Sequence, residues 1–183
     1  MKEDNIIDKI TPEESLVILK ELIKTNTNLK SKVIKLAKDM FCSVDLNEIS
    51  DEVFSILDFI DVHDLWDRSG GTSSGEYDSP DEVAYIMIEE ALDPFVREME
   101  RLISLKMFQQ SKLYCMGLLK GIFEFEISSN SEFKDWSVDI PAEIFSDILS
   151  IWEKSANDED KEEMKNFIKK EFSIWSEWAV KCF

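Results

Sequence analysis

Apolar residues recur every three or four positions through most of this chain, which is the spacing of one face of an α-helix. The chain has only 5 Gly and 4 Pro among 183 residues. A β-rich protein needs a turn roughly every 8–12 residues and spends more of these residues on its turns. The pattern therefore predicts an all-α protein of seven to eight helices.

Two capping boxes mark helix starts. Thr11, followed by Pro12 and Glu14, predicts a helix to about residue 25, and Ser79, followed by Pro80 and Glu82, predicts one to about residue 105. Other apolar patterns predict helices near 28–41, 49–60, 141–152 and 157–179. The segment 107–125 is apolar nearly all round, so we expect it to be a central, covered helix.

Short connections between these helices favour antiparallel neighbours. Stacked helix hairpins form either a TPR-like solenoid or a compact bundle, and both alternatives stay open because no strict repeat is present. Residues 68–79 are rich in Gly, Ser and Thr, which is typical of a loop. We expect a single all-helical domain over residues 1–183 with a flexible loop at 68–79.

Two segments resemble a known family. ESLVILKELIKTNTNLKSKVIKLA (14–37) resembles the helix pair that follows the zinc-binding module in SWIM-type zinc-finger proteins. ERLISLKMFQQSKLYCMGLLKGIFEF (100–125) is similar to paired helices in the TPR-like region of those proteins. The resemblance covers roughly residues 13–150 and implies a helical scaffold. The chain has no Cys/His set like the SWIM zinc ligands, so the resemblance implies nothing about metal or nucleic acid.

The net charge of −18 repels nucleic acid and anionic membranes, so we expect neither as a partner. Residues 61–100 hold 12 acids and only two cations, Arg68 and Arg97. One interpretation is solvated helix faces with acidic first turns, which suit the helix dipole. The other is a surface that steers a protein partner with a basic surface.

The cysteines, Cys42, Cys115 and Cys182, are far apart and odd in number. This usage is typical of reduced thiols rather than of a disulfide framework or a zinc site. The first ten residues have no apolar signal core, and no apolar run approaches the roughly 18 residues that cross a bilayer. We therefore expect a cytoplasmic protein.

The densest group of chemically versatile side chains is Asp61, His63, Asp64 and Asp67, beside Trp66. Imidazole and carboxylates bind divalent metals, so His63, Asp61 and Asp67 are the alternative metal ligands. A structural polar turn and a contact with a partner are the other interpretations. Asp64 and Arg68 are four residues apart and could form an ion pair on one face of a helix. Such a pair favours the interpretation as a structural polar turn.

No catalytic motif accompanies this group. The chain lacks the Gly-x-Ser-x-Gly nucleophile elbow. The Gly70–Gly75 segment lacks the Gly-Lys-Ser/Thr of a phosphate-binding loop and is followed by acids. We therefore expect a protein that is not an enzyme and has no cofactor.

Small and aromatic residues in the later helices predict packing. Gly117 and Gly121 form a Gly-x-x-x-Gly pair, which in a soluble helix lets another helix approach closely. Trp175 and Trp178 are expected in the core. If they formed an exposed stripe instead, they would make a surface for a homodimer or a partner.

We predict an acidic helical scaffold that acts as a protein–protein interaction module. Trp and Tyr are enriched among binding anchors, so the expected partner-binding residues are Trp66, Tyr77, Asp64 and Asp67. One alternative is a metal-binding protein or metal-dependent enzyme centred on residues 61–67. The other is a self-assembling structural protein that dimerises through its C-terminal aromatic helix.

Overall fold

The computed structural model describes residues 4–7, 9–41, 43–71 and 77–183. The chain divides into two compact units, Met1–Ser43 and Val44–Phe183, which we call the N-terminal unit and the C-terminal unit. Whether the two units form the single domain that the sequence predicts stays a prediction.

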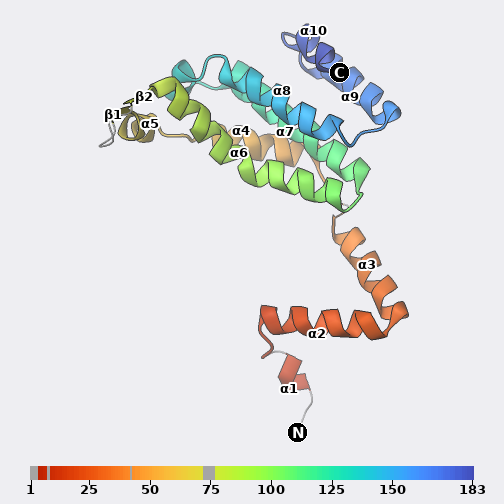
Figure 1. Ribbon diagram of the computed structural model, residues 1–183. Coiled ribbons are helices and arrows are strands. Elements are labelled where there is room, and N and C mark those ends of the chain that lie inside the picture. Colours follow the sequence, from red (N-terminus) through yellow and green to blue (C-terminus); the bar gives the residue numbers. More distant parts are fainter. Residues whose placement is uncertain (1–3, 8, 42, 72–76) are drawn as a thin grey trace. The chain divides into compact units, whose positions relative to one another are not determined.

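The N-terminal unit is a pair of helices that meet at a wide angle, preceded by one short helical turn (Figure 1). The predicted capping box at Thr11 is confirmed, since its side chain accepts the Glu14 amide while the Glu14 carboxylate accepts the Thr11 amide. Asn26 caps the next helix by accepting the Leu29 amide at 3.0 Å. The elements are α1 (Asp4–Ile7), α2 (Pro12–Thr25) and α3 (Thr27–Phe41).

The C-terminal unit is a helical bundle, which confirms the all-α prediction (Figure 1). In the described ranges of the two units, seven helices are 13 residues or longer. Whether the hairpins form a TPR-like repeat stays a prediction. The elements are α4 (Leu46–Asp58), α5 (Val62–Arg68), β1 (Gly70–Gly71), β2 (Tyr77–Asp78), α6 (Pro80–Ser104), α7 (Phe108–Ser128), η1 (Glu132–Trp136), α8 (Ile140–Glu153), α9 (Asp158–Glu171), α10 (Ser176–Ala179) and η2 (Val180–Cys182).

The predicted loop at 68–79 lies between α5 and α6. Gly70–Gly71 pairs antiparallel with Tyr77–Asp78, so both ends of the segment are held side by side. Residues 72–76 lie outside the described residues. The flexibility of the loop therefore stays a prediction. Within the described ranges, no helix is both long and apolar enough to cross a membrane.

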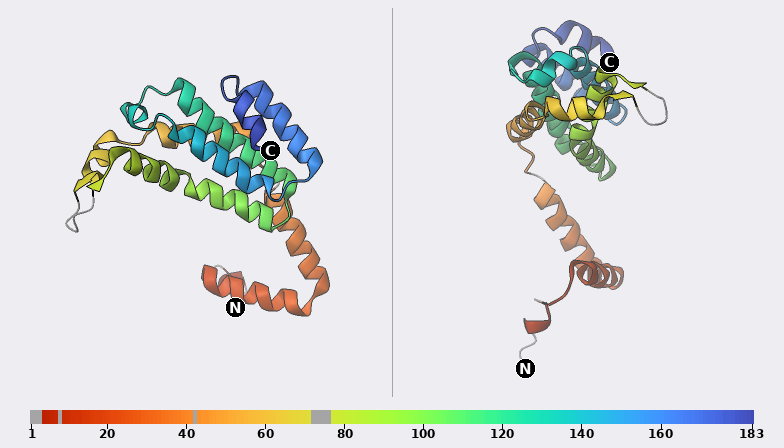
Figure 2. Two further views of the ribbon diagram at one scale, coloured as in Figure 1. Left: turned by 45° about the horizontal axis from the view of Figure 1, so that its top comes forward. Right: turned by 90° about the vertical axis from the view of Figure 1, so that its left-hand side faces the viewer.

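Helix α7 is the central helix of the C-terminal unit, as its apolar sequence predicts. It packs against α4, α6, α8 and α9. Figures 1 and 2 show α6, α7 and α8 side by side. Eleven of its residues are buried, and these include Cys115 and Phe125.

The glycine pair of α7 permits the close approach of α4, as predicted. A Cβ atom added to Gly117 would lie 2.7 Å from the Leu46 carbonyl oxygen. A Cβ atom added to Gly121 would lie 2.6 Å from both the Ser50 carbonyl oxygen and the Val53 Cβ. Both glycines are therefore needed for helix contact rather than for a turn.

The C-terminal aromatic residues pack into the core. Trp175 is only 8% exposed, and its ring lies 5.2 Å from Phe123 and 5.3 Å from Phe145, centroid to centroid. The core prediction is thus confirmed for Trp175. The expected single helix over 157–179 is wrong, because Phe172 leaves helical geometry (φ −111°, ψ 70°) and ends α9. A separate short helix, α10, follows.

Glu126 near the end of α7 carries a buried carboxylate oxygen that finds no hydrogen-bond donor among the described residues. Burial raises the pKa of this carboxyl, nearby Lys134 opposes the rise, and Asp139 adds to it. The folded state therefore binds this proton more tightly than the unfolded state does. Its contribution to stability is complete below the ordinary pKa of 4.5 and is lost as the pH rises through the raised value.

We expect Glu126→Gln to stabilise the protein at pH 7 by about 1 kcal/mol, since the side chain is partly buried and water screens part of its charge. The gain should vanish near pH 4, where the wild-type carboxyl is already protonated. Thermal unfolding followed by circular dichroism at both pH values checks this. A variant that is less stable than wild type at pH 7 would contradict the assignment of Glu126 as an unfavourable buried charge.

Candidate functional site

The predicted Asp/His cluster lies on and just before α5. Asp61 caps this helix, because its Oδ1 accepts the backbone amide of His63 at 2.8 Å. Asp64 and Asp67 are exposed on the same short helix. In the part of the chain that the structure describes, no three His, Cys, Asp or Glu side chains form a group that could hold a metal ion.

Trp66 is the aromatic member of the predicted partner-binding set. It is 47% exposed, and its ring meets Trp136 of η1 edge to face at 4.6 Å between centroids. The side chain is therefore held by η1 while half of it faces solvent. Tyr77 belongs to β2 by its backbone, but its side chain lies outside the described residues.

Arg68 links α5 to α6 rather than to its own helix. Its two terminal nitrogens donate to the two carboxylate oxygens of Glu90 at 2.9 and 3.0 Å. The expected ion pair with Asp64 is thus replaced by this bidentate one. The hydrogen bonds that Arg68 donates to Glu90, together with a weaker attraction to Asp64, raise the pKa of Arg68, although partial burial opposes the rise.

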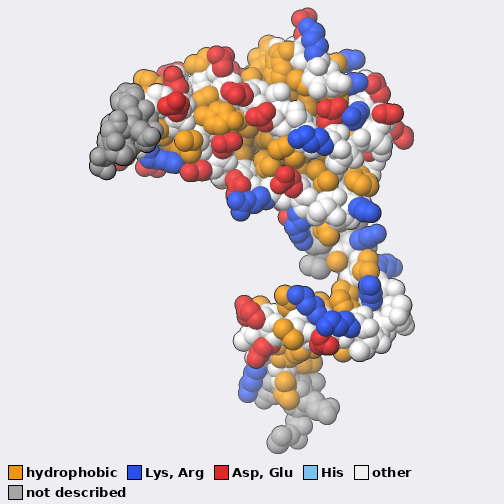
Figure 3. Space-filling view, in the orientation of Figure 1, with side chains coloured by type: hydrophobic (Ala, Val, Ile, Leu, Met, Phe, Trp, Pro, Cys, Tyr) orange, Lys and Arg blue, Asp and Glu red, His pale blue; other side chains and the backbone are white. Residues whose placement is uncertain are grey.

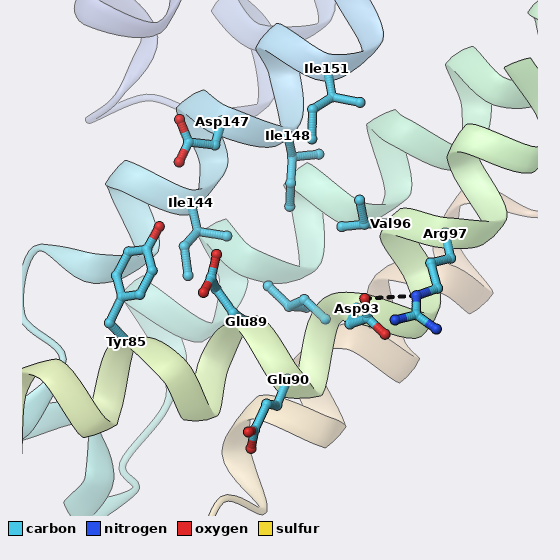
Figure 4. A pocket seen from close by; sticks show the side chains of 11 residues that line it. Tyr85, Glu89, Glu90, Asp93, Val96, Arg97, Ile144, Asp147, Ile148 and Ile151 are labelled. Atoms are coloured by element: carbon cyan, nitrogen blue, oxygen red, sulfur yellow. Dashed lines mark hydrogen bonds and ion pairs between the residues drawn. The ribbon is translucent and has the colours of Figure 1, made fainter.

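A groove of about 490 Å³ runs between α6 and α8. We call it the α6–α8 groove. Its floor is apolar, and Figure 4 shows Val96 of α6 facing Ile148 and Ile144 of α8 across it. The lining residues are Tyr85, Glu89, Glu90, Leu92, Asp93, Val96, Arg97, Ile144, Asp147, Ile148 and Ile151.

Carboxylates stand on both sides of this floor. Glu89 and Asp93 come from α6, and Asp147 comes from α8 (Figure 4). Glu90 points to the other side of α6, toward its pairing with Arg68. Asp93 accepts from the Nε of Arg97 at 2.9 Å, so Arg97 offsets one of the acids.

Tyr85 stands at one end of the groove among acids. Desolvation by burial raises the pKa of its hydroxyl, and the carboxylates of Glu89, Asp147 and Glu143 raise it further. The hydroxyl is therefore protonated at neutral pH. The acids that line this end of the groove and the adjoining surface, Glu89, Asp147 and Glu143, make it a negative environment that favours a cation.

A second recess of about 600 Å³ adjoins the groove, since Tyr85 lines both. It is lined by Ile86 and Ile140 and by three further acids, Asp81, Glu82 and Glu143. From Ile86 to Arg97 the surface follows 12 residues of α6, and the 11 steps between them span roughly 16 Å of helix. Figure 3 shows exposed apolar side chains over α6 and α8 with acidic side chains around them.

An apolar floor with charged rims fits an amphipathic segment of opposite charge. Sequence reasoning identified the acidity of residues 61–100 but not Tyr85 or Asp147. One pattern in the sequence could have indicated this surface. Tyr85, Glu89 and Asp93 are spaced four residues apart, so they lie on one face of α6.

Comparison of the chain with models of protein families, with curated proteins and with solved structures finds no match.

Proposed function

We propose that this protein is a protein-binding module whose α6–α8 groove receives a basic amphipathic helix of a partner. The observation that carries the proposal is the apolar floor formed by Val96, Ile144 and Ile148, with carboxylates on both of its rims. This deepens the acidic scaffold predicted from the sequence. The proposed contact surface lies on α6 and α8 rather than on α5.

The physical basis is helix-in-groove recognition. An amphipathic helix buries apolar residues at positions i, i+3 or i+4, and i+7 in a hydrophobic groove, and these anchors supply most of the affinity. Lysines or arginines flanking that stripe would meet Glu89, Asp93 and Asp147. Complementary charge raises the rate of encounter and fixes orientation. A groove roughly 16 Å long accommodates about three helical turns.

The test uses a defined probe. An 18-residue helical peptide with leucines at helical spacing and lysines on both flanks is titrated into the full chain by calorimetry. We expect saturable one-to-one binding that weakens as salt rises, because exposed charges are screened. A peptide of the same composition in scrambled order, which has no apolar face, should bind at least about tenfold more weakly.

Two charge-reversal variants distinguish attraction by the acids of the groove from attraction by the net charge of the whole chain. Glu89→Lys with Asp147→Lys should weaken binding of the ordered peptide at least about tenfold. Asp51→Lys with Glu100→Lys makes the same change in net charge at exposed positions outside the groove and should change affinity less than about twofold. Equal losses in the two variants would mean non-specific attraction and would sink the proposal.

The contact surface predicted from the sequence is tested in the same titration. If Trp66, Asp64 and Asp67 also contact the partner, Trp66→Ala should weaken peptide binding without changing thermal stability. Their participation stays a prediction. No contact among the described residues favours the metal alternative at His63, Asp61 and Asp67. Metal content of the purified protein, compared with that of His63→Ala, tests it.

A further inference from the structure

A recess continues the α6–α8 groove beyond Tyr85. It has a volume of about 600 Å³ and shares Tyr85 with the groove. We call it the Tyr85 recess. Its lining residues are Asp81, Glu82, Tyr85 and Ile86 of α6, with Ile140 and Glu143 of α8. The recess therefore extends the surface that we propose to receive a partner helix.

The walls of the Tyr85 recess are apolar and aromatic. Ile86 is 46% exposed and Ile140 is almost fully buried, and both contribute hydrocarbon surface to the recess. Figure 4 shows the Tyr85 ring extending from α6, with its hydroxyl toward α8. Such walls suit the methylene stem of a long cationic side chain, whose charged end then reaches a polar rim.

The rim of the Tyr85 recess is acidic. The described residues that line it include three carboxylates and no lysine or arginine. Within the described part of the chain, neither Asp81 nor Glu143 forms an ion pair. At the other end of the groove, by contrast, Asp93 is paired with Arg97 at 2.9 Å. An incoming cation therefore finds unpaired carboxylates at the recess and a competing cation at the Arg97 end.

Arginine suits this combination of walls and rim better than lysine does. Its guanidinium is planar, packs against the face of an aromatic ring and donates several hydrogen bonds at once. The ammonium of lysine is compact and more strongly hydrated. The recess has one tyrosine ring, and its unpaired acids come from two helices, Asp81 from α6 and Glu143 from α8. Both features favour a planar cation with several donors.

We infer that the Tyr85 recess binds one arginine side chain of the partner helix and so selects arginine over lysine at that position. The stem of the arginine packs on Ile86 and Ile140, and its guanidinium packs on the ring of Tyr85. Its charge is met by Asp81 and Glu143. This inference rests on the proposed function, because the floor of the α6–α8 groove holds the helix that carries the arginine.

The test compares three forms of the leucine-based helical peptide by calorimetry with the full chain. The flanking positions all carry lysine, all carry arginine, or all carry citrulline, which has the shape of arginine without its charge. We expect the arginine peptide to bind at least about fivefold more tightly than the lysine peptide, and the citrulline peptide to bind most weakly. Equal affinity of the arginine and lysine peptides would overturn the inference while leaving the proposed function intact.

Asp81→Asn with Glu143→Gln locates the preference at the recess. Both side chains are exposed, and Glu82, which forms the capping box of α6, is unchanged, so the fold should survive. The arginine peptide should then bind less than about twofold more tightly than the lysine peptide. The matched control, Asp51→Asn with Glu100→Gln, removes the same charge outside the groove and should keep the wild-type preference.

Two further results would overturn the inference alone. One is a preference for arginine that persists in the Asp81/Glu143 variant, and the other is a preference that falls equally in the Asp51/Glu100 variant. Failure of every peptide to bind wild type would overturn the proposed function and the inference together.

Discussion

Gly121→Ala is expected to destabilise the protein by about 1–3 kcal/mol, although alanine is the better helix former. A Cβ at this position would lie 2.6 Å from the Ser50 carbonyl oxygen and 2.6 Å from the Val53 Cβ. Neither neighbour is the end of a flexible side chain, so α4 and α7 must move apart. Overpacking of a filled core costs about 1–3 kcal/mol or more, and Gly121→Leu should cost more than alanine.

The sign of the effect decides between two explanations. Helix propensity alone predicts that Gly→Ala stabilises a helix interior by about 1 kcal/mol. Close contact between α4 and α7 predicts destabilisation. Urea unfolding followed by far-UV circular dichroism measures the free energy of unfolding of both variants. Leu113→Ala, at an exposed position of the same helix, is the control. A stabilised Gly121→Ala would contradict the packing of α4 on α7.

Lys112→Met is expected to cost about 3–5 kcal/mol, because it leaves a buried carboxylate without its cation. The Lys112 and Asp160 side chains are 4% and 6% exposed, and Nζ lies 2.6 Å from Oδ1. Glu163 also contacts this ammonium. Asn157 donates to the other oxygen of Asp160 at 2.7 Å. The pair therefore fixes the start of α9 against α7.

The pKa of Lys112 gives the pH range of this effect. Burial lowers it, but hydrogen bonds to Asp160 and Glu163 outweigh burial and raise it above the ordinary value of 10.5. A raised pKa in the folded state means that the stabilisation is complete below pH 10.5 and is lost as the pH rises through the raised value. The difference between wild type and variant should therefore be constant around neutral pH.

A double variant provides the control for the buried pair. Lys112→Met with Asp160→Asn removes both charges, so it should recover most of the lost stability, to within about 1–2 kcal/mol of wild type. Urea unfolding at pH 7 measures all three proteins. If Lys112→Met alone were as stable as wild type, Asp160 would have to be solvated, and the buried contact between α7 and α9 would be wrong.

Local signals predicted much of the helical layout. The capping boxes at Thr11 and Ser79 start α2 and α6 as expected, because these side-chain contacts span only three residues. The sequence of α7 is apolar nearly all round, and this predicted that the helix is central. The end of α9 was missed because Phe172 and Trp175 keep apolar spacing through a non-helical turn. Spacing shows which side chains share a face, not whether the backbone between them stays helical.

The candidate site was predictable only in its charge. The α6–α8 groove joins Tyr85 and Glu89 to Asp147, about 60 positions further along the chain, and only tertiary packing brings these together. The ion pair between Arg68 and Glu90 could not be predicted for the same reason, because Glu90 lies on another helix. Sequence reasoning weighed the i,i+4 neighbour Asp64, since only local partners can be read from spacing.

The apolar stripe of the N-terminal unit shows a different limit. Spacing predicted the buried faces of two helices, and α2 and α3 are indeed amphipathic, but none of their described side chains is buried. An amphipathic pattern indicates that the apolar face of a helix packs against another element. It does not state whether that element comes from the same chain.

The most direct test of the central claim, that the α6–α8 groove receives a basic amphipathic helix, is isoleucine-methyl NMR of the full chain during titration with the lysine–leucine peptide. We predict shifts confined to methyl groups around the groove, chiefly those of Ile144, Ile148 and Ile151. Isoleucines elsewhere in the C-terminal unit, such as Ile168 and Ile174, should not move. Binding that shifts other isoleucines and leaves Ile144, Ile148 and Ile151 unchanged would contradict the account.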